Sequence, residues 1–371
     1  MTDNHTNSRI KRLADGLVIA SFVLGCGTPL VCTLWCVGSQ ESLREKRAAA
    51  PWPALEPTVH SLKKFPRCFD AYYNDHFGLR AALVRLNACL RVHGLGVSAS
   101  EQVVLGREGW LFYDGDDAMA ARRGLLRWSR EELDQIQRDL EARRDWLAAR
   151  GCQYLFVIAP NKESIYPEYL PAWLEADRDT CIDQLVGHLA AHSDVRVLDL
   201  RPALQAARGH GLLYFRTDSH WNTLGALCAY RHMMQALARS SEVRAASSAD
   251  FEAVPYRYMQ GDLPALLGLE FDEESIHLRP RQPRQARIRR GTRFVSECAS
   301  GELPATIMLY DSFGHSLIPF LSEHFQRLVY VWQQDLPVEL IERERPGLLI
   351  QEIVERRLWA GDFHRVPAGK K

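Results

Sequence analysis

The sequence predicts an α/β protein with a mostly parallel sheet that helices cover on both faces. From about residue 150 onward, short apolar runs recur along the chain, and segments with helical periodicity separate them. The runs are continuous rather than alternating, as in strands that are buried on both faces. Strands that alternate with helices form parallel sheets, because each helix carries the chain back across the sheet.

The expected elements follow one another in a regular order. Ser129 and Glu132 form a capping box for a helix that ends near Arg150. We expect strands at 154–158, 195–200, 305–310, 328–332 and 348–354, and helices at 180–192, at 222–239 and from 312 to about 325. Before them, 65–90 has the spacing of a helical cap, and VVLGREGWLFY at 103–113 predicts a hairpin. Residues 240–300 interrupt the pattern and are expected to be a loop-rich insertion.

Composition excludes some classes of protein. The chain has 371 residues, 46% of them hydrophobic, which is enough for a sizeable core. Its 46 basic and 46 acidic residues cancel, so no overall field attracts nucleic acid, and nucleic-acid binding is not expected. No motif indicates a cofactor.

The N-terminal region predicts a membrane anchor. Gly16 to Gly38 contains no charged residue and is long enough to cross a bilayer core of about 30 Å. We expect a cytoplasmic tail and transmembrane helix at 1–40, a stem at 41–60, and one soluble domain at 61–371. A short tail inside would place that domain in the periplasm, on the inner membrane, although basic residues flank both ends of the helix. A cleaved signal peptide and lipid attachment at Cys26 are the alternatives.

Nine cysteines leave the disulfide pattern open. Three fall in the expected anchor, and the other six are Cys68, Cys89, Cys152, Cys181, Cys228 and Cys298. One or two disulfides would suit a domain outside the cytosol, but the spacing selects no partners. The absence of a CxxC motif argues against a zinc site.

A first candidate for chemistry is the segment Thr217 to Trp221. In an extended chain, positions two apart project to the same side, so Asp218 and His220 can face one cavity. An imidazole accepts a proton at physiological pH, and a carboxylate on its other nitrogen sets its tautomer. The pair therefore has the equipment of a general base. The alternative is that Asp218 or Ser219 caps the next helix while His220 and Trp221 pack.

A second candidate is Ser312, which follows an apolar strand and begins a helix. A serine on a tight strand-to-helix turn presents its hydroxyl outward, and backbone N–H groups at the helix start can hold an oxyanion. An ordinary capping role for Asp311 and Ser312 is the alternative. Both candidate segments are expected at the carboxyl ends of strands, where open parallel sheets place their sites. His315, one turn further on, could compete as the base, but a helix-face position suits it better.

These segments carry a resemblance to a known family. TDSHWN, YDSFGHSLIPFLSEHF, YNDHFGLR, GREGWLFY, APNKESIYPEYLP and LLIQEIVERRL, spread over about 65–358, resemble the alginate O-acetyltransferase family with its SGNH-hydrolase-like domain. The resemblance implies a three-layer α/β/α sandwich in which Ser312 is the nucleophile, His220 the base and Asp218 its orienting acid. It also implies transfer of acetyl groups to an exported polysaccharide, with a membrane-bound O-acyltransferase as the partner that supplies them.

Two features depart from this resemblance. The separate oxyanion donors of ordinary SGNH hydrolases are not evident, and Asn161 and Lys162 are our candidates for oxyanion or substrate binding, against a structural role at the strand end. No C-terminal carbohydrate-binding domain is expected, so glycan affinity would come from the main cleft. Trp221 either stacks on a sugar ring or is buried beside the catalytic residues.

Three alternative functions stay open. A hydrolase would use the same three residues with water as the acceptor. A metal enzyme would use Asp218, His220 and His210, although no HExxH motif or carboxylate-rich cluster accompanies them, and we expect no metal. A non-catalytic scaffold or glycan-binding protein would keep the fold without the chemistry.

Overall fold

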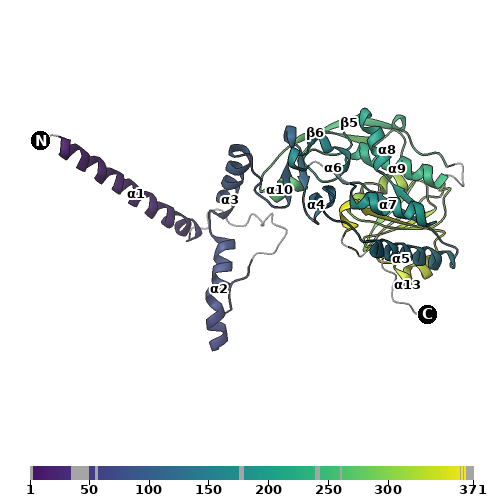
Figure 1. Cartoon of the computed structure of the whole chain (residues 1–371), viewed down its shortest axis with the longest axis horizontal. Coiled ribbons are helices and arrows are strands. Elements are labelled where there is room, and N and C mark those ends of the chain that lie inside the picture. The colour runs from purple at the N-terminus through teal and green to yellow at the C-terminus, as the bar shows by residue number, and fades with distance from the viewer. Residues whose placement is uncertain are drawn as a thin grey trace. The chain divides into compact units, whose positions relative to one another are not determined.

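A computed structural model describes residues 3–34, 50–54, 57–174, 179–238, 243–259, 261–359, 361 and 363–364. The chain divides into two compact units (Figure 1). One comprises residues 1–100 with 265–269, and the other comprises 101–264 with 270–371. The second unit contains the main sheet and both candidate segments.

The first unit is helical. It contains α1 (Asp3–Leu34), α2 (Val59–His76) and α3 (Arg80–Cys89), and the helical cap expected at 65–90 is confirmed as helix. Thr58 begins α2 by accepting a hydrogen bond from the backbone N–H of Ser61 at 3.2 Å.

The expected transmembrane helix at 16–38 is not confirmed. Within the described ranges, no helix combines the length and the apolar character needed to cross a bilayer. The last four residues of that expected helix, and most of the expected stem at 41–60, lie outside the described residues.

The second unit opens with the expected hairpin of β1 (Val103–Leu105) and β2 (Leu111–Tyr113). The strands are antiparallel, and Leu105 pairs with Leu111. Gly106 begins the turn because a Cβ at this position would lie 2.6 Å from Phe112 and from the backbone oxygen of Tyr169. The hairpin prediction is therefore confirmed.

The main sheet has seven strands in the order β4-β3-β11-β9-β10-β8-β7. Five of them are the strands expected from apolar runs: β3 (Gln153–Ala159), β4 (Val197–Asp199), β9 (Thr306–Leu309), β10 (Arg327–Val331) and β11 (Leu348–Val354). These five run parallel. The other two strands pair antiparallel with their neighbours: β8 (Phe294–Glu297) with β10, and β7 (Arg287–Arg290) with β8. The sheet is therefore mixed, with an antiparallel edge that the mostly parallel prediction did not include.

Helices cover both faces of this sheet. Along β3, Tyr154, Phe156 and Ile158 enter one hydrophobic core, while Leu155, Val157 and Ala159 enter the other. The first core is completed by α5 (Arg130–Ala148), α7 (Cys181–His192) and α13 (Val338–Glu344), and the second by α8 (Arg201–Ala207), α9 (Thr223–Leu237) and α12 (Ile318–Leu321). Figure 1 shows α8 and α9 on one side of the sheet and α5 and α13 on the other.

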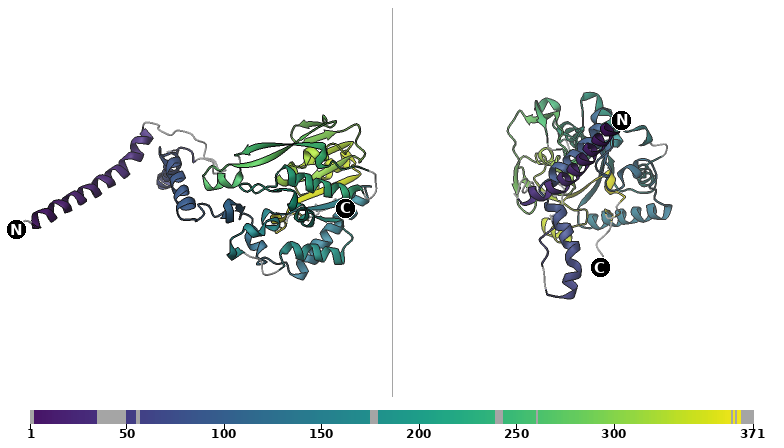
Figure 2. Two further views of the ribbon diagram at one scale, coloured as in Figure 1. Left: turned by 90° about the horizontal axis from the view of Figure 1, so that it is seen from above. Right: turned by 90° about the vertical axis from the view of Figure 1, so that its left-hand side faces the viewer.

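The expectation of a loop-rich insertion at 240–300 is wrong. This region contains β5 (Phe251–Tyr258) and β6 (Glu273–Pro280), which pair antiparallel over their full length, with α10 (Asp262–Leu267) between them (Figure 2). It also supplies β7 and β8. β5 and β6 are largely exposed strands, so they have no continuous apolar run to mark them in the sequence.

Two smaller expectations are also corrected. The helix expected from 312 to about 325 is two short helices, α11 (Ser312–His315) and α12, because a turn at Ser316 and Leu317 interrupts it. The six cysteines outside the expected anchor are all free, so the disulfides considered from the sequence do not form among them.

The two-core architecture makes a stability prediction. Leu140 on α5 is fully buried, so Leu140→Ala should lower the free energy of unfolding by about 2–5 kcal/mol through lost burial and a cavity. Leu125→Ala is the matched control because Leu125 is 59% exposed, and it should have little effect. Urea denaturation measures both, and equal costs would contradict this packing.

Candidate active site

Three neighbouring strands end at the same edge of the main sheet. β3, β11 and β9 are adjacent and parallel, so their carboxyl ends lie side by side. Asn161 follows β3, Glu355 follows β11, and Ser312 follows β9. The edge is the place where an open parallel sheet collects its functional residues.

The turn that carries Ser312 is held by two buried carboxyl groups. Asp311 caps α11: its Oδ1 accepts from the Phe313 N–H at 3.0 Å, and its Oδ2 accepts from the Val354 N–H at 2.8 Å. Glu352 Oε2 accepts from the Asp311 N–H at 3.1 Å. Burial, with the charge of Asp311 beside it, holds the pKa of Glu352 well above its usual value. A neutral Glu352 beside Asp311 therefore supports the turn.

Gly314 allows this close packing. A Cβ there would lie 2.6 Å from Glu352 Oε2 and 2.6 Å from Tyr310 Cβ, so a larger residue would displace the carboxyl group. The capping alternative is correct for Asp311, and it leaves Ser312 as the first residue of the helix.

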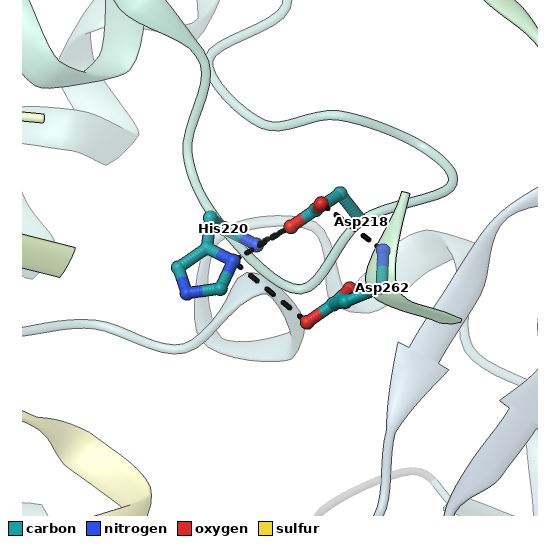
Figure 3. Close-up of side chains that lie close together, drawn as sticks. All are labelled: Asp218, His220 and Asp262. Carbon is teal, nitrogen blue, oxygen red and sulfur yellow. Dashed lines mark hydrogen bonds and ion pairs between the residues drawn. The ribbon is translucent and has the colours of Figure 1, made fainter. Parts of the chain in front are cut away.

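Asp218 and His220 lie together, but not through strand alternation. Residues 216–220 form a series of bends, and Asp218 Oδ1 accepts from the backbone N–H of His220 at 2.9 Å. The same oxygen contacts His220 Nδ1 at 2.7 Å (Figure 3). This local aspartate turn explains why the pair forms. The following helix, α9, is capped by Asn222, so neither Asp218 nor Ser219 has the capping role considered above.

The His220 ring meets the Ser312 turn. Its centroid lies 4.9 Å from that of Phe313, the residue next to Ser312. His220 Nε2 is buried and has no hydrogen-bond partner among the described residues, and Figure 3 shows it on the side of the ring opposite the carboxylates. The structure thus brings together two segments that are about ninety residues apart in the sequence.

The buried side chain of Lys162 binds the loop that carries Asp218 and His220. Its Nζ donates to the carbonyl oxygens of Phe215, Arg216 and Asp218 at 3.1, 3.1 and 2.7 Å. Burial lowers the pKa of Lys162 to about 8 despite nearby carboxylates, of which Asp218 contributes most. Because these three bonds use all three ammonium protons, Lys162 positions the loop and has none left for an oxyanion.

The region taken for loops supplies three further residues of the site. Tyr258 donates to Asp218 Oδ2 at 2.6 Å. Asp262 accepts from the N–H and the hydroxyl of Ser219 at 2.8 and 2.6 Å. Glu273 accepts from the N–H groups of Arg216 and Thr217 at 2.8 and 2.9 Å. No motif in the sequence marks these residues, because only the fold brings β5, α10 and β6 to the loop.

Asp218 is ionised in this setting. Its burial opposes ionisation, but hydrogen bonds from His220 and Tyr258 outweigh that effect and lower the pKa of Asp218 to about 2. Burial and the Asp218 charge raise the pKa of Tyr258, which therefore stays a neutral donor. The histidine consequently has a charged acceptor on Nδ1, which favours Nε2 as the basic nitrogen.

Asn161 follows β3 at the sheet edge that also carries the Ser312 turn, and it is 3% exposed. Its backbone N–H donates to Glu355 Oε2 at 3.0 Å, and its Oδ1 accepts from Arg356 at 3.2 Å. The Arg356 guanidinium also lies 5.3 Å from the Phe313 ring. Because Arg356 occupies the amide oxygen, the amide NH₂ of Asn161 is left as a donor.

Trp221 and His315 do not take the functional roles considered for them. Trp221 is 1% exposed and packs edge-on against Phe313, so its ring is buried beside the candidate catalytic residues. His315 packs against Phe294 on the wall of a cavity of about 290 Å³ that Trp221, Arg284 and Arg290 also line. The carboxylate of Asp218 pairs with His220 and not with His315, so His220 is the better candidate for the base.

Asp218, His220 and Asp262 have ligand atoms within 4.8 Å of one another, which is close enough to consider a metal ion. His210 is not in this group. The geometry favours hydrogen bonding, because His220 Nδ1 and Asp218 Oδ1 are 2.7 Å apart and the remaining carboxylate oxygens accept from Tyr258 and Ser219. These residues therefore fit a general base better than a metal site.

Fold and site together define an SGNH-hydrolase-like protein. The family model described as "SGNH hydrolase-like domain, acetyltransferase AlgX" matches residues 103–329, which is more than half of the chain. The chain therefore belongs to this family, and the resemblance noted in the sequence is confirmed.

Two relatives have names that describe an activity. The "Probable alginate O-acetylase AlgJ" of Pseudomonas syringae pv. tomato is 29% identical over 216 residues, which cover 56% of this chain and 51% of the relative. The protein of the same name from Pseudomonas aeruginosa is 27% identical over 247 residues, which cover 64% and 58%. The chain thus spans about half the length of these relatives.

Solved structures agree on the fold. Bacillus cereus PatB1 with a sulfonyl adduct has a TM-score of 0.56 at 14% identity, over 71% of this chain and 97% of that one. A DHHW family protein from Eubacterium siraeum has a TM-score of 0.51 at 15% identity, over 72% and 99%.

Glu163 gives the site a testable pH dependence. It is 3% exposed, and burial, with the nearby charge of Glu355, raises its pKa to about 7 from 4.5. As the pH rises, the unfolded chain therefore releases this proton at a lower pH than the folded protein does. The free energy of unfolding consequently falls by on the order of 3 kcal/mol between pH 4.5 and 7.

Glu163→Gln should remove this loss. Urea denaturation at pH 4.5 and at pH 7.5 should show a smaller fall in stability for the variant than for the wild type. Equal falls would mean that Glu163 titrates normally in the folded protein.

Proposed function

We propose that this protein is an O-acetyltransferase that places acetyl groups on hydroxyls of an exported polysaccharide through an acetyl-Ser312 intermediate. The observation that carries the proposal is the Asp218–His220 pair, whose imidazole contacts Phe313 next to Ser312 at the end of β9. Membership in the AlgX acetyltransferase family and the alginate O-acetylase names of the relatives support the acetyl group and the polysaccharide.

The first step forms the acyl-enzyme. Ser312 Oγ attacks the acetyl carbonyl of the donor while His220 Nε2 takes the serine proton. The tetrahedral intermediate collapses, the bond to the donor oxygen breaks, and the proton passes from His220 to that leaving group. Asp218 remains ionised throughout and stabilises the protonated ring.

The second step reverses these roles. A sugar hydroxyl gives its proton to His220 Nε2 and attacks the acetyl carbonyl of acetyl-Ser312. Ser312 Oγ then leaves and recovers the proton, so the enzyme is regenerated and one acetyl ester has moved.

The oxyanion would be held by groups at the same sheet edge. The Phe313 N–H donates to Asp311, so the Ser312 N–H at the start of α11 and the amide NH₂ of Asn161 are the donors that this arrangement offers. Of the two candidates named from the sequence, only Asn161 has a free donor, since Lys162 is bound to loop carbonyls.

The intermediate can be observed directly. The protein is incubated with 4-nitrophenyl acetate and digested, and mass spectrometry locates the acetyl group. We expect acetyl on the peptide that contains Ser312, and none in Ser312→Ala, whose 4-nitrophenol release should fall by at least about 100-fold because the nucleophile is gone. Full turnover by Ser312→Ala would refute the assignment.

The acceptor separates a transferase from an esterase, which would use the same residues. With acetyl donor and a polysaccharide oligomer present, a transferase yields acetylated oligomer, whereas an esterase yields free acetate at the same rate with or without the oligomer. A scaffold would yield neither, and Ser312→Ala would leave acetylation of the polymer in cells intact.

Location and partner complete the proposal. We propose attachment to the inner membrane, with the sheet domain in the periplasm and a membrane-bound O-acyltransferase as the acetyl source. The uncharged N-terminal stretch at 16–38 and the resemblance to the alginate O-acetyltransferase family support this arrangement. Protease protection in spheroplasts tests it, since an outward-facing domain is digested without lysis.

A further inference from the structure

We propose that Asp262 is a second carboxylate of the catalytic centre, a positioning residue that acts with Asp218 to stabilise the protonated His220 ring. The inference rests on the proposed function, because it concerns the charge that His220 acquires when Ser312 loses its proton. Asp262 is the first residue of α10, which lies in the region that the sequence predicts to be a loop-rich insertion.

The geometry places two carboxylates on one edge of the imidazole. His220 Nδ1 lies 2.7 Å from Asp218 Oδ1 and 3.8 Å from Asp262 Oδ2, and Figure 3 shows both on the same side of the ring. The Asp262 side chain is 26% exposed, so its charge is partly shielded from water. An opposite charge within about 4–6 Å of a titrating group stabilises its charged form.

Asp262 is held in this place by three contacts. It accepts from the N–H and the hydroxyl of Ser219, at 2.8 and 2.6 Å, and its own N–H donates to Asp218 Oδ2 at 3.2 Å. The Ser219 hydroxyl is also 3.3 Å from His220 Nδ1. Asp218, Ser219 and Asp262 therefore form one hydrogen-bonded unit beside the ring.

The other groups around this unit do not replace the charge of Asp262. The Phe313 ring lies against the imidazole and is neutral. The Tyr258 hydroxyl donates to Asp218, and its pKa is raised, so it adds no charge. The Lys162 ammonium binds the carbonyl oxygen of Asp218, and Glu273 binds backbone N–H groups of Arg216 and Thr217. Lys162 opposes a positive imidazole, which increases the need for a second negative charge.

The consequence is a shift in the pH dependence of acylation. Removing the Asp262 charge makes protonation of His220 less favourable, so the ring remains a free base at lower pH. The same change weakens the ring as a base at higher pH, because the positive charge that develops during acylation loses a partner.

The test is the rate of acetyl-Ser312 formation from 4-nitrophenyl acetate as a function of pH, with the full chain. For Asp262→Asn we expect the acid limb of kcat/KM to move to lower pH by about one unit and the plateau to fall about tenfold. Asp262→Glu retains the charge and should keep the limb near the wild-type position. Thermal denaturation checks that each variant is folded, and Asp262→Ser serves if the asparagine variant is not.

Two controls separate charge from structure. Asp272→Asn removes one charge from a side chain that is 39% exposed and paired with Arg257, and it should behave as the wild type. Ser219→Ala removes the hydroxyl between Asp262 and the ring but keeps the charge, so its acid limb should stay in place even if its rate falls.

Each outcome decides one question. An unmoved acid limb in folded Asp262→Asn overturns the inference, as does a shift of the same size in Ser219→Ala. Loss of wild-type activity on treatment with a chelator would also overturn it, since Asp262 would then be a metal ligand. Absence of acetyl-Ser312 in the wild type would refute the proposed function instead, whatever the variants do.

Discussion

The buried charges that hold residues 216–220 are the constraint on which the site depends. This loop belongs to no strand of the main sheet, so its backbone groups lack the partners that a sheet would give them. Lys162 binds the carbonyl oxygens of Arg216 and Asp218 and that of the preceding Phe215, and Glu273 accepts from two N–H groups of the loop. Because unpaired buried polar groups are costly, the loop has one well-determined conformation, and that conformation presents His220.

A second polar arrangement serves the serine. Asp311 and Glu352 join the turn after β9 to β11 through backbone N–H groups, and Gly314 leaves the space for the glutamate. The hydrophobic cores on the two faces of the sheet determine where these strands end. Where the turn meets the loop, Phe313 contacts the His220 ring, and the Arg356 guanidinium also lies near Phe313.

Much of the sheet could be predicted because buried parallel strands are continuous apolar runs. The strands at 153–159, 327–331 and 348–354 were recognisable for this reason. The exposed strands β5 and β6, the edge strand β7 and its neighbour β8 lack such runs, so the sequence predicts loops there. Strand alternation predicted correctly that Asp218 and His220 lie together, but the two residues are not in a strand. A local turn brings them together, in which Asp218 accepts from the His220 N–H.

The sequence by itself determined much of the strand and helix pattern and the family, and it named the Ser312 and Asp218–His220 segments as candidates, because local patterning and short motifs carry that information. Only the tertiary structure decided that Lys162 binds backbone carbonyl oxygens of the loop, that Trp221 is buried, and that Tyr258, Asp262 and Glu273 contact residues 217–219. Such roles depend on which distant groups satisfy each other's hydrogen bonds and charges. Those partners are set by packing, which no local pattern in the chain encodes.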